Sequence, residues 1–109
     1  MTRLKSAIWV SALLRRCQVE GKFGALLRKG AEEAGAVYVV INHLDGTYDL
    51  LGPPPGSSHD DEGQRIFEKL FAAPVPWADV SAKIEKQAGF DSDIWAVEIE
   101  DRDGLAGLR

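Results

Sequence analysis

The chain is 109 residues long, with 45% hydrophobic and 28% charged residues, which is the size and composition of one ordinary globular domain. These values exclude a largely disordered chain and a membrane-embedded one. Thirteen basic against seventeen acidic side chains give a net charge of −4, which argues against nucleic-acid binding because that binding needs a basic surface.

The first predicted element is a helix over residues 6–20. At about 100° per residue its apolar side chains fall on one arc, and Gly21 follows as a stop signal. Ile8 falls outside the arc, so the first turn is expected to be extended rather than helical. The arc, which should face a core, consists of Trp9, Val10, Leu13, Leu14 and Cys17.

Three strands are predicted between residues 22 and 51. The segment 22–30 is short and lies between glycines, whereas 36–44 is dense in β-branched and aromatic residues. The nearly continuous apolar character of 36–44 predicts a central strand covered on both faces. Asp45-Gly46 predicts a hairpin turn, because both residues accept the positive φ of a primed turn, and 47–51 is the returning strand.

The second half of the chain contains a loop, an ambiguous segment, a helix and a last strand. Residues 52–63 include three successive prolines and predict an exposed loop. Residues 65–71 fit both a helix and a strand, and a strand is favoured. A helix over 76–88 and a strand over 94–100 follow. The order α-β-β-β-β-α-β predicts one α+β domain over 1–109, with an antiparallel-rich sheet of about five strands and two packed helices.

The last strand runs into a series of acids, WAVEIEDRDG, over residues 95–104. Side chains alternate between the two faces of a strand, so Trp95, Val97 and Ile99 share an inner face. Glu98 and Glu100 share the other face, which we expect to be solvated. The tract after them has the composition of a turn, and a solvated strand end is the favoured interpretation.

An alternative is a magnesium site at this strand, in a small hydrolase or transferase with His43 as general base. Hard cations prefer clustered carboxylate oxygens, although the spacing does not match the helix–loop–helix calcium signature. Two histidines and one cysteine match no zinc spacing, so no cofactor is expected. The carboxylates of this hypothetical metal site are Glu98, Glu100, Asp101 and Asp103.

Other polar candidates are single residues or one small patch. His43 is expected to cap a hairpin end, His59 to be a solvated loop residue, and Cys17 to be a small core residue rather than a nucleophile. A basic patch could bind phosphate or an acidic partner, but a solvated surface is favoured. The patch consists of Arg15, Arg16, Arg28 and Lys29.

The three tryptophans and the acidic strand supply candidates for an interface. Trp9, Trp77 and Trp95 all belong to elements with apolar patterning, so burial in the core is expected first. A tryptophan left on the surface would mark an interface. Glu98 and Glu100 would join such an interface, and would also discourage unwanted strand pairing if their strand lay at the sheet edge.

Four stretches of the chain together resemble a known family. They are IWVSALLRR at 8–16, RKGAEEAGAVYV at 28–39, the turn at 44–46, and FDSDIWAVEIEDRDG at 90–104. As a set they are similar to a family of small alphaproteobacterial proteins that is catalogued as a domain of unknown function. The resemblance implies a stand-alone, soluble α+β protein and carries no catalytic or binding residue with it.

The sequence as a whole predicts a cytoplasmic protein. One cysteine permits no internal disulfide, and the apolar run near the start precedes its arginines, unlike a signal peptide. No polar constellation has catalytic spacing, so a non-catalytic protein-binding or adaptor module, with a protein partner or with itself, is the first hypothesis. The magnesium enzyme and an anion or nucleic-acid binder remain as alternatives, and no membrane association is expected.

Overall fold

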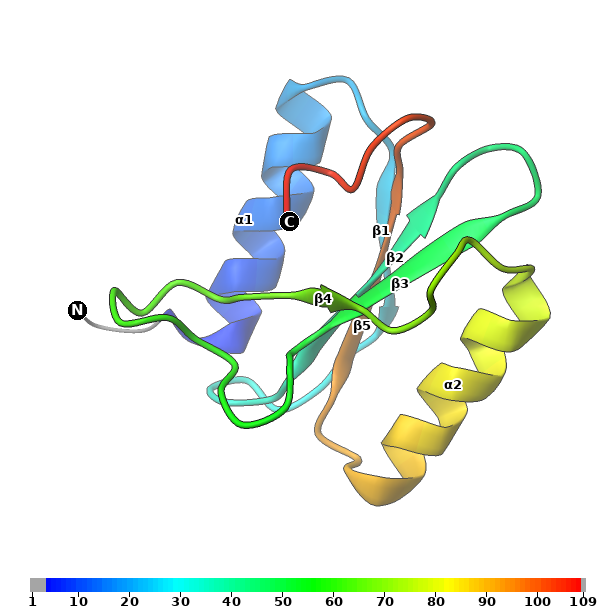
Figure 1. The fold of residues 1–109 in the computed structure, drawn as a ribbon. Coiled ribbons are helices and arrows are strands. Elements are labelled where there is room, and N and C mark those ends of the chain that lie inside the picture. The colour runs from blue at the N-terminus through cyan, green and yellow to red at the C-terminus, as the bar shows by residue number, and fades with distance from the viewer. Residues whose placement is uncertain (1–3, 109) are drawn as a thin grey trace.

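Residues 4–108, which the computed structural model describes, form two helices and one five-stranded sheet (Figure 1). The predicted order of elements is confirmed, and the ends of the predicted domain, residues 1–3 and 109, lie outside the described part. Neither helix of that part is long and apolar enough to cross a membrane. The elements are α1 (Ser6–Val19), β1 (Gly24–Arg28), β2 (Val37–Asn42), β3 (Tyr48–Gly52), β4 (Glu68–Lys69), α2 (Trp77–Phe90) and β5 (Trp95–Glu100).

The sheet has the strand order β1-β5-β2-β3-β4 and is mixed. β5 runs parallel to β2 and antiparallel to β1, and β3 is antiparallel to both of its neighbours. The last strand of the chain is therefore inserted between the first and the second. The radius of gyration, 13.1 Å, is that expected of a single domain of this length, about 13 Å.

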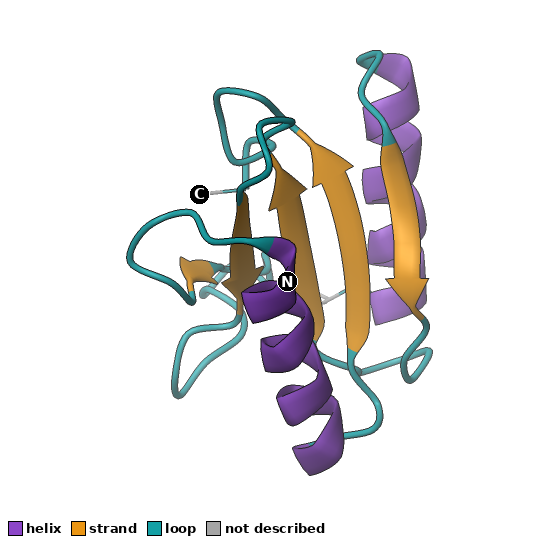
Figure 2. Ribbon diagram, turned by 90° about the vertical axis from the view of Figure 1, so that its right-hand side faces the viewer, coloured by secondary structure: helices purple, strands orange, loops and turns teal. Residues whose placement is uncertain are grey.

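The two helices cover opposite faces of the sheet, so the molecule has three layers (Figures 1 and 2). Helix α1 buries Val10, Leu13 and Cys17 against one face, as the predicted arc requires. Helix α2 places Val80 on the other face, against Val40 and Leu50. This is why β2 is apolar at successive positions: it contributes to both cores, as its pattern predicts.

Local details differ from the sequence prediction in three places. The first turn of α1 is helical, and Ile8 is exposed on it rather than in an extended segment. Within 65–71 only β4 is a strand, because its two residues alone continue the ladder beside β3. In the β2–β3 hairpin the positive φ angles belong to Leu44 and Gly46, at 64° and 88°, while Asp45 Oδ1 accepts hydrogen bonds from Thr47.

Candidate functional site

Strand β1 forms one edge of the sheet, and in residues 4–108 only β5 pairs with it. Its outer backbone groups are consequently open to a further strand. Edge strands of this kind are usually protected by charged side chains or proline within the strand. The sequence of β1, GALLR, instead places two leucines at its centre.

Leu26 and Leu27 project to opposite faces of the sheet. Leu26 pairs with Val97, a core residue of the α1 face, while Leu27 lines a pocket against α2. A β-bulge at this point places two residues of β1 opposite one residue of β5. Both leucines are exposed, at 45% and 42%, so the edge of the sheet presents apolar surface on both faces.

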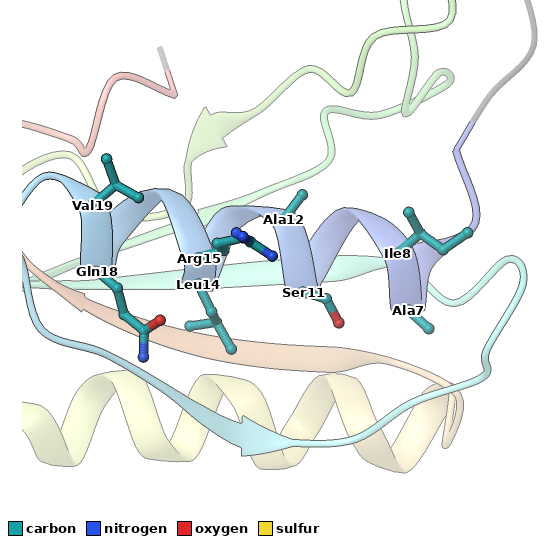
Figure 3. Close-up of a pocket in the computed structure, with 8 residues that line it drawn as sticks. All are labelled: Ala7, Ile8, Ser11, Ala12, Leu14, Arg15, Gln18 and Val19. Carbon is teal, nitrogen blue, oxygen red and sulfur yellow. The ribbon is translucent and has the colours of Figure 1, made fainter.

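On the α1 face, a shallow groove runs along the helix beside β1. Figure 3 shows Leu14 and Gln18 pointing from α1 towards the side on which β1 runs. A Cβ atom at Gly24 would lie 3.0 Å from Leu14 Cδ2, so the helix approaches the strand closely there. Exposed Ile8 and Val19 line the groove near its two ends, and the polar side chains of Ser11, Arg15 and Gln18 lie between them.

On the α2 face, a smaller pocket lies between the helix and β1. Its volume is about 230 Å³, and Trp77, Ile84 and Leu27 supply its apolar walls. Trp77 is 41% exposed and packs against Tyr48, with ring centroids 5.4 Å apart. Of the three tryptophans, Trp77 is therefore the one that the structure leaves on the surface, beside the open edge.

The other two tryptophans are structural. Trp95 is buried, and its indole N–H donates a hydrogen bond of 2.8 Å to the Ala31 carbonyl. Trp9 is partly buried, packs against Phe67, and has the Arg65 guanidinium 5.7 Å above its ring. Neither indole is presented to a partner in the way the interface hypothesis requires.

The four basic residues of the predicted patch do not form one cluster. Arg28 lies in the α2-side pocket and donates to the Ser92 carbonyl, while Arg15 lines the groove of α1. Lys29 follows β1 directly and is exposed. Arg16 is turned away to the C-terminal segment, where it donates to the Ala106 carbonyl at 2.6 Å. Arg28 and Lys29 thus lie in and directly after β1, Arg15 lies on α1, and Arg16 holds the C-terminal segment.

The acidic strand β5 is internal, not an edge, so its glutamates protect no free backbone. Glu98 accepts a hydrogen bond of 3.1 Å from Asn42 Nδ2, and Glu100 is partly buried. Asp101 Oδ2 accepts from the Ala106 N–H at 2.9 Å and lies 3.4 Å from Lys22 Nζ. Asp103 is exposed in the turn that follows.

These placements do not meet the requirement of the metal hypothesis. Across residues 4–108, no three side chains from His, Cys, Asp and Glu lie together so that they could hold a metal ion. Burial raises the pKa of Asp101, but the Ala106 N–H and the Lys22 ammonium outweigh it, and the net pKa is lowered. The carboxylate is therefore a fixed anion that fastens the chain after β5.

His43 is engaged at both ring nitrogens. Nδ1 lies 2.9 Å from the Asp101 carbonyl oxygen, and Nε2 lies 2.9 Å from Asp49 Oδ2. A carbonyl and a carboxylate are both acceptors, so the ring satisfies both only as an imidazolium that donates twice. Because both ring nitrogens are engaged by groups of the fold, His43 is not placed to act as the general base of the hydrolase or transferase hypothesis.

The surroundings of His43 favour its charged form. Burial lowers the pKa of the imidazole, but the hydrogen bonds to Asp49 and the Asp101 carbonyl, with the Asp49 and Asp45 charges, outweigh burial and raise it. Cys17 is buried on the α1 face, and burial raises the pKa of its thiol, as befits a core residue. His59 contacts the Ser58 hydroxyl at 2.8 Å in the central loop.

Sequence reasoning missed three residues that define these sites: Leu26, Leu27 and Asp49. The adjacent leucines of β1 indicate an exposed apolar surface only once β1 is known to be an edge strand. That knowledge depends on how β1 pairs with a strand far along the chain. Asp49 could have been found from the sequence more readily, because an acid in the otherwise apolar strand TYDLL needs a hydrogen-bonding partner if it is buried. The structure supplies that partner as His43.

The fold and these sites define a small three-layer α+β protein with an open apolar sheet edge and a buried histidine–aspartate pair. The chain belongs to the family described as "Protein of unknown function (DUF1491)", whose model matches residues 4–109. No curated protein matches the chain.

Solved structures of relatives share the fold. The solution structure of protein Atu0922 from A. tumefaciens is 44% identical, with a TM-score of 0.82, over 98% of this chain and 92% of that one. The crystal structure of a DUF1491 family protein from Caulobacter crescentus CB15 is 36% identical, with a TM-score of 0.77, over 96% and 92%. An NMR structure of a DUF1491 family protein from the same organism is 37% identical, with a TM-score of 0.77, over 99% and 94%.

Proposed function

We propose that this protein is a non-catalytic binding module that holds an extended segment of a partner protein along the free edge of β1. The observation that carries the proposal is the exposure of Leu26 and Leu27 on the two faces of one open edge. An added strand would gain main-chain hydrogen bonds from β1, and its alternating side chains would enter the two flanking depressions.

The two depressions suit alternating side chains of a bound strand. Successive side chains of a strand point to opposite faces, so one set would lie on the α1 groove and the other on the Trp77 pocket. Each buried apolar side chain of valine or leucine size contributes about 1.5–3 kcal/mol before the cost of ordering the segment. Main-chain pairing gives affinity, and the pockets give the choice of sequence.

The charges beside the edge favour an acidic partner segment. Arg28 lies in β1, Lys29 follows it, and Arg15 lines the groove of α1; Arg15 and Lys29 make no ion pair within residues 4–108. A second copy of the chain would bring the same cations to the same edge, where like charges repel. A segment with apolar residues at its centre and acidic residues at its ends complements both the leucines, which project to opposite faces, and the cations.

A designed peptide tests this chemistry directly. We would titrate an acetylated peptide with a central run of valines flanked by glutamates into ¹⁵N-labelled protein and follow the backbone amides of Gly24–Arg28. Saturable shifts centred on β1 are expected, with binding at least tenfold weaker for the matching valine–lysine peptide. Equal binding of the two peptides, or shifts that avoid β1, would contradict the proposal.

Substitutions in β1 test whether a natural partner binds at the same edge as the peptide. In a pull-down from the native host, Leu26→Lys with Leu27→Lys should abolish recovery of any stoichiometric partner, since charge on an edge opposes strand addition. Leu44→Lys is the matched control, because Leu44 is equally exposed, at 44%, but lies on the β2–β3 hairpin. Sedimentation equilibrium completes the test: a dimer abolished by the edge variant would assign the edge to self-association and overturn the proposal.

A further inference from the structure

Another pocket lies away from the β1 edge, where the β2–β3 hairpin, β4 with the segment after it, and the C-terminal segment meet. Its volume is about 650 Å³. The hairpin supplies its floor and one wall, Lys69 and Pro74 supply another, and residues 102–107 close the third side. The side chains that matter for its chemistry are His43, Thr47, Asp49, Lys69, Arg102 and Asp103.

The floor of this pocket contains an unsatisfied acceptor. Asp49 is 2% exposed, and Oδ2 is occupied by His43, whereas Oδ1 has no hydrogen-bond partner in residues 4–108. Buried polar atoms are nearly always hydrogen-bonded, because leaving one unpaired costs about 1–3 kcal/mol. Asp49 lines the pocket, so its carboxylate is the buried group there that a donor on a bound molecule would satisfy.

The donor that fits Asp49 Oδ1 is a neutral one. Where His43 is protonated, its imidazolium lies 2.9 Å from Asp49 Oδ2 and already supplies a cation to this carboxylate. An ammonium group placed at Oδ1 would lie beside that imidazolium and be repelled by it. A hydroxyl group supplies the hydrogen bond without adding a second cation.

The walls of the pocket carry cations that can receive an anion. Lys69 and Arg102 make no ion pair with any described residue, so both charges face the pocket or solvent. Of the acids on the same walls, Asp45 already accepts hydrogen bonds from Thr47, and Asp103 is exposed. Arginine and lysine are the side chains that bind carboxylate and phosphate groups in proteins.

We propose that this pocket binds a small hydroxylated organic anion, a carboxylate or a phosphate ester, with its hydroxyl on Asp49 Oδ1 and its anionic group on Lys69 and Arg102. The site is independent of the β1 edge, since it shares no lining residue with either depression there. The hydroxyl anchors the ligand at the buried end, and the cations hold the charged end at the mouth.

NMR titration with simple probes tests the proposal below the ordinary pKa of histidine, where His43 is charged. The probes are glycerate and glycerol 3-phosphate, and the matched controls are propionate, which lacks hydroxyls, and glycerol, which lacks the anion. Saturable shifts are expected at the amides of Thr47, Asp49 and Gly104 with at least one probe. Comparison of the two probes shows whether a carboxylate or a phosphate is preferred, and each control should bind at least tenfold more weakly.

Rim variants keep the test clear of folding effects. Arg102→Met removes an exposed side chain and Lys69→Met a partly buried one, so each should fold and weaken probe binding at least tenfold. Lys29→Met, a cation removed beside β1, should change nothing. The proposal is wrong if no probe gives saturable shifts at millimolar concentration, if propionate binds as well as glycerate, or if the rim variants bind like the wild type.

Discussion

Replacing His43 by leucine is expected to destabilise the protein strongly, because it leaves the buried Asp49 carboxylate without its hydrogen-bonding partner. The two side chains are 11% and 3% exposed and are joined by a contact of 2.9 Å. Removing one partner of a buried ion pair typically costs about 3–5 kcal/mol, since the remaining charge is left without compensation. Leucine is close to histidine in volume, so the loss does not come from a cavity.

The size of this effect is large compared with the stability of a small domain. Such a domain unfolds with a free energy of about 5–15 kcal/mol, and each 1 kcal/mol lowers Tm by about 4–8 °C at this chain length. We therefore expect Tm to fall by at least about 12 °C for His43→Leu. Circular dichroism during heating and during denaturant titration measures both quantities.

A double-mutant cycle separates the stranded charge from other effects of the substitution. His43→Leu combined with Asp49→Leu should recover most of the loss, because an apolar pair of similar volume often replaces a buried ion pair without cost. Asp49→Leu alone should cost less than His43→Leu near neutral pH, since a lone imidazole can give up its proton. A cost below about 1 kcal/mol for His43→Leu would refute the account of the buried pair.

Three further outcomes follow from the same structure. The pKa of His43 is raised above its ordinary value of 6.5, so its protonation stabilises the fold fully below that pH. This contribution is lost as the pH rises through the folded-state pKa of His43. In denaturant titrations, the free energy of unfolding should therefore fall with pH over this range in the wild type and not in His43→Leu. Cys17 is 1% exposed, so native protein should react with Ellman's reagent only at the rate of unfolding, and rapid native labelling would contradict its burial. Gly30→Ala should lower the free energy of unfolding by about 1–3 kcal/mol, because its Cβ would overlap the Asp93 carbonyl. Gly89→Ala should raise the free energy of unfolding by about 0.4–1 kcal/mol, because a Cβ there enters open space on α2. Similar effects of the two substitutions in denaturant titrations would count against this packing.

The elements of this fold follow from local sequence patterns, but their neighbours in the sheet do not. The apolar run of β2 correctly predicts a strand that is covered on both faces, because that pattern lies within the strand itself. The position of β5 depends on pairing with β1, about seventy residues away, and no pattern in either strand encodes it. The alternating glutamates of β5 are therefore a pattern typical of an edge strand, although β5 lies inside the sheet.

The His43–Asp49 pair depends on the length of the turn between β2 and β3, because one residue more or less changes the face on which His43 lies. A two-residue turn at Asp45-Gly46 would place His43 opposite Tyr48 and on the other face from Asp49. The observed hairpin instead closes with the His43 N–H donating to the Thr47 carbonyl, and Ile41 pairs with Asp49. His43 and Asp49 then lie on the same face. Leu44 adopts the left-handed conformation that this longer turn requires.

Asp101 explains why a run of acids ends the last strand without forming a metal site. Its carboxylate accepts from the Ala106 N–H and from Lys22, and its carbonyl accepts from His43, so one residue joins the C-terminal segment, the loop before β1 and the β2–β3 hairpin. An acidic side chain that accepts from several donors in this way holds segments of the fold together. Asp49, whose buried Oδ1 has no hydrogen-bond partner in residues 4–108, lies outside the acidic run and lines the pocket that the C-terminal segment helps to close.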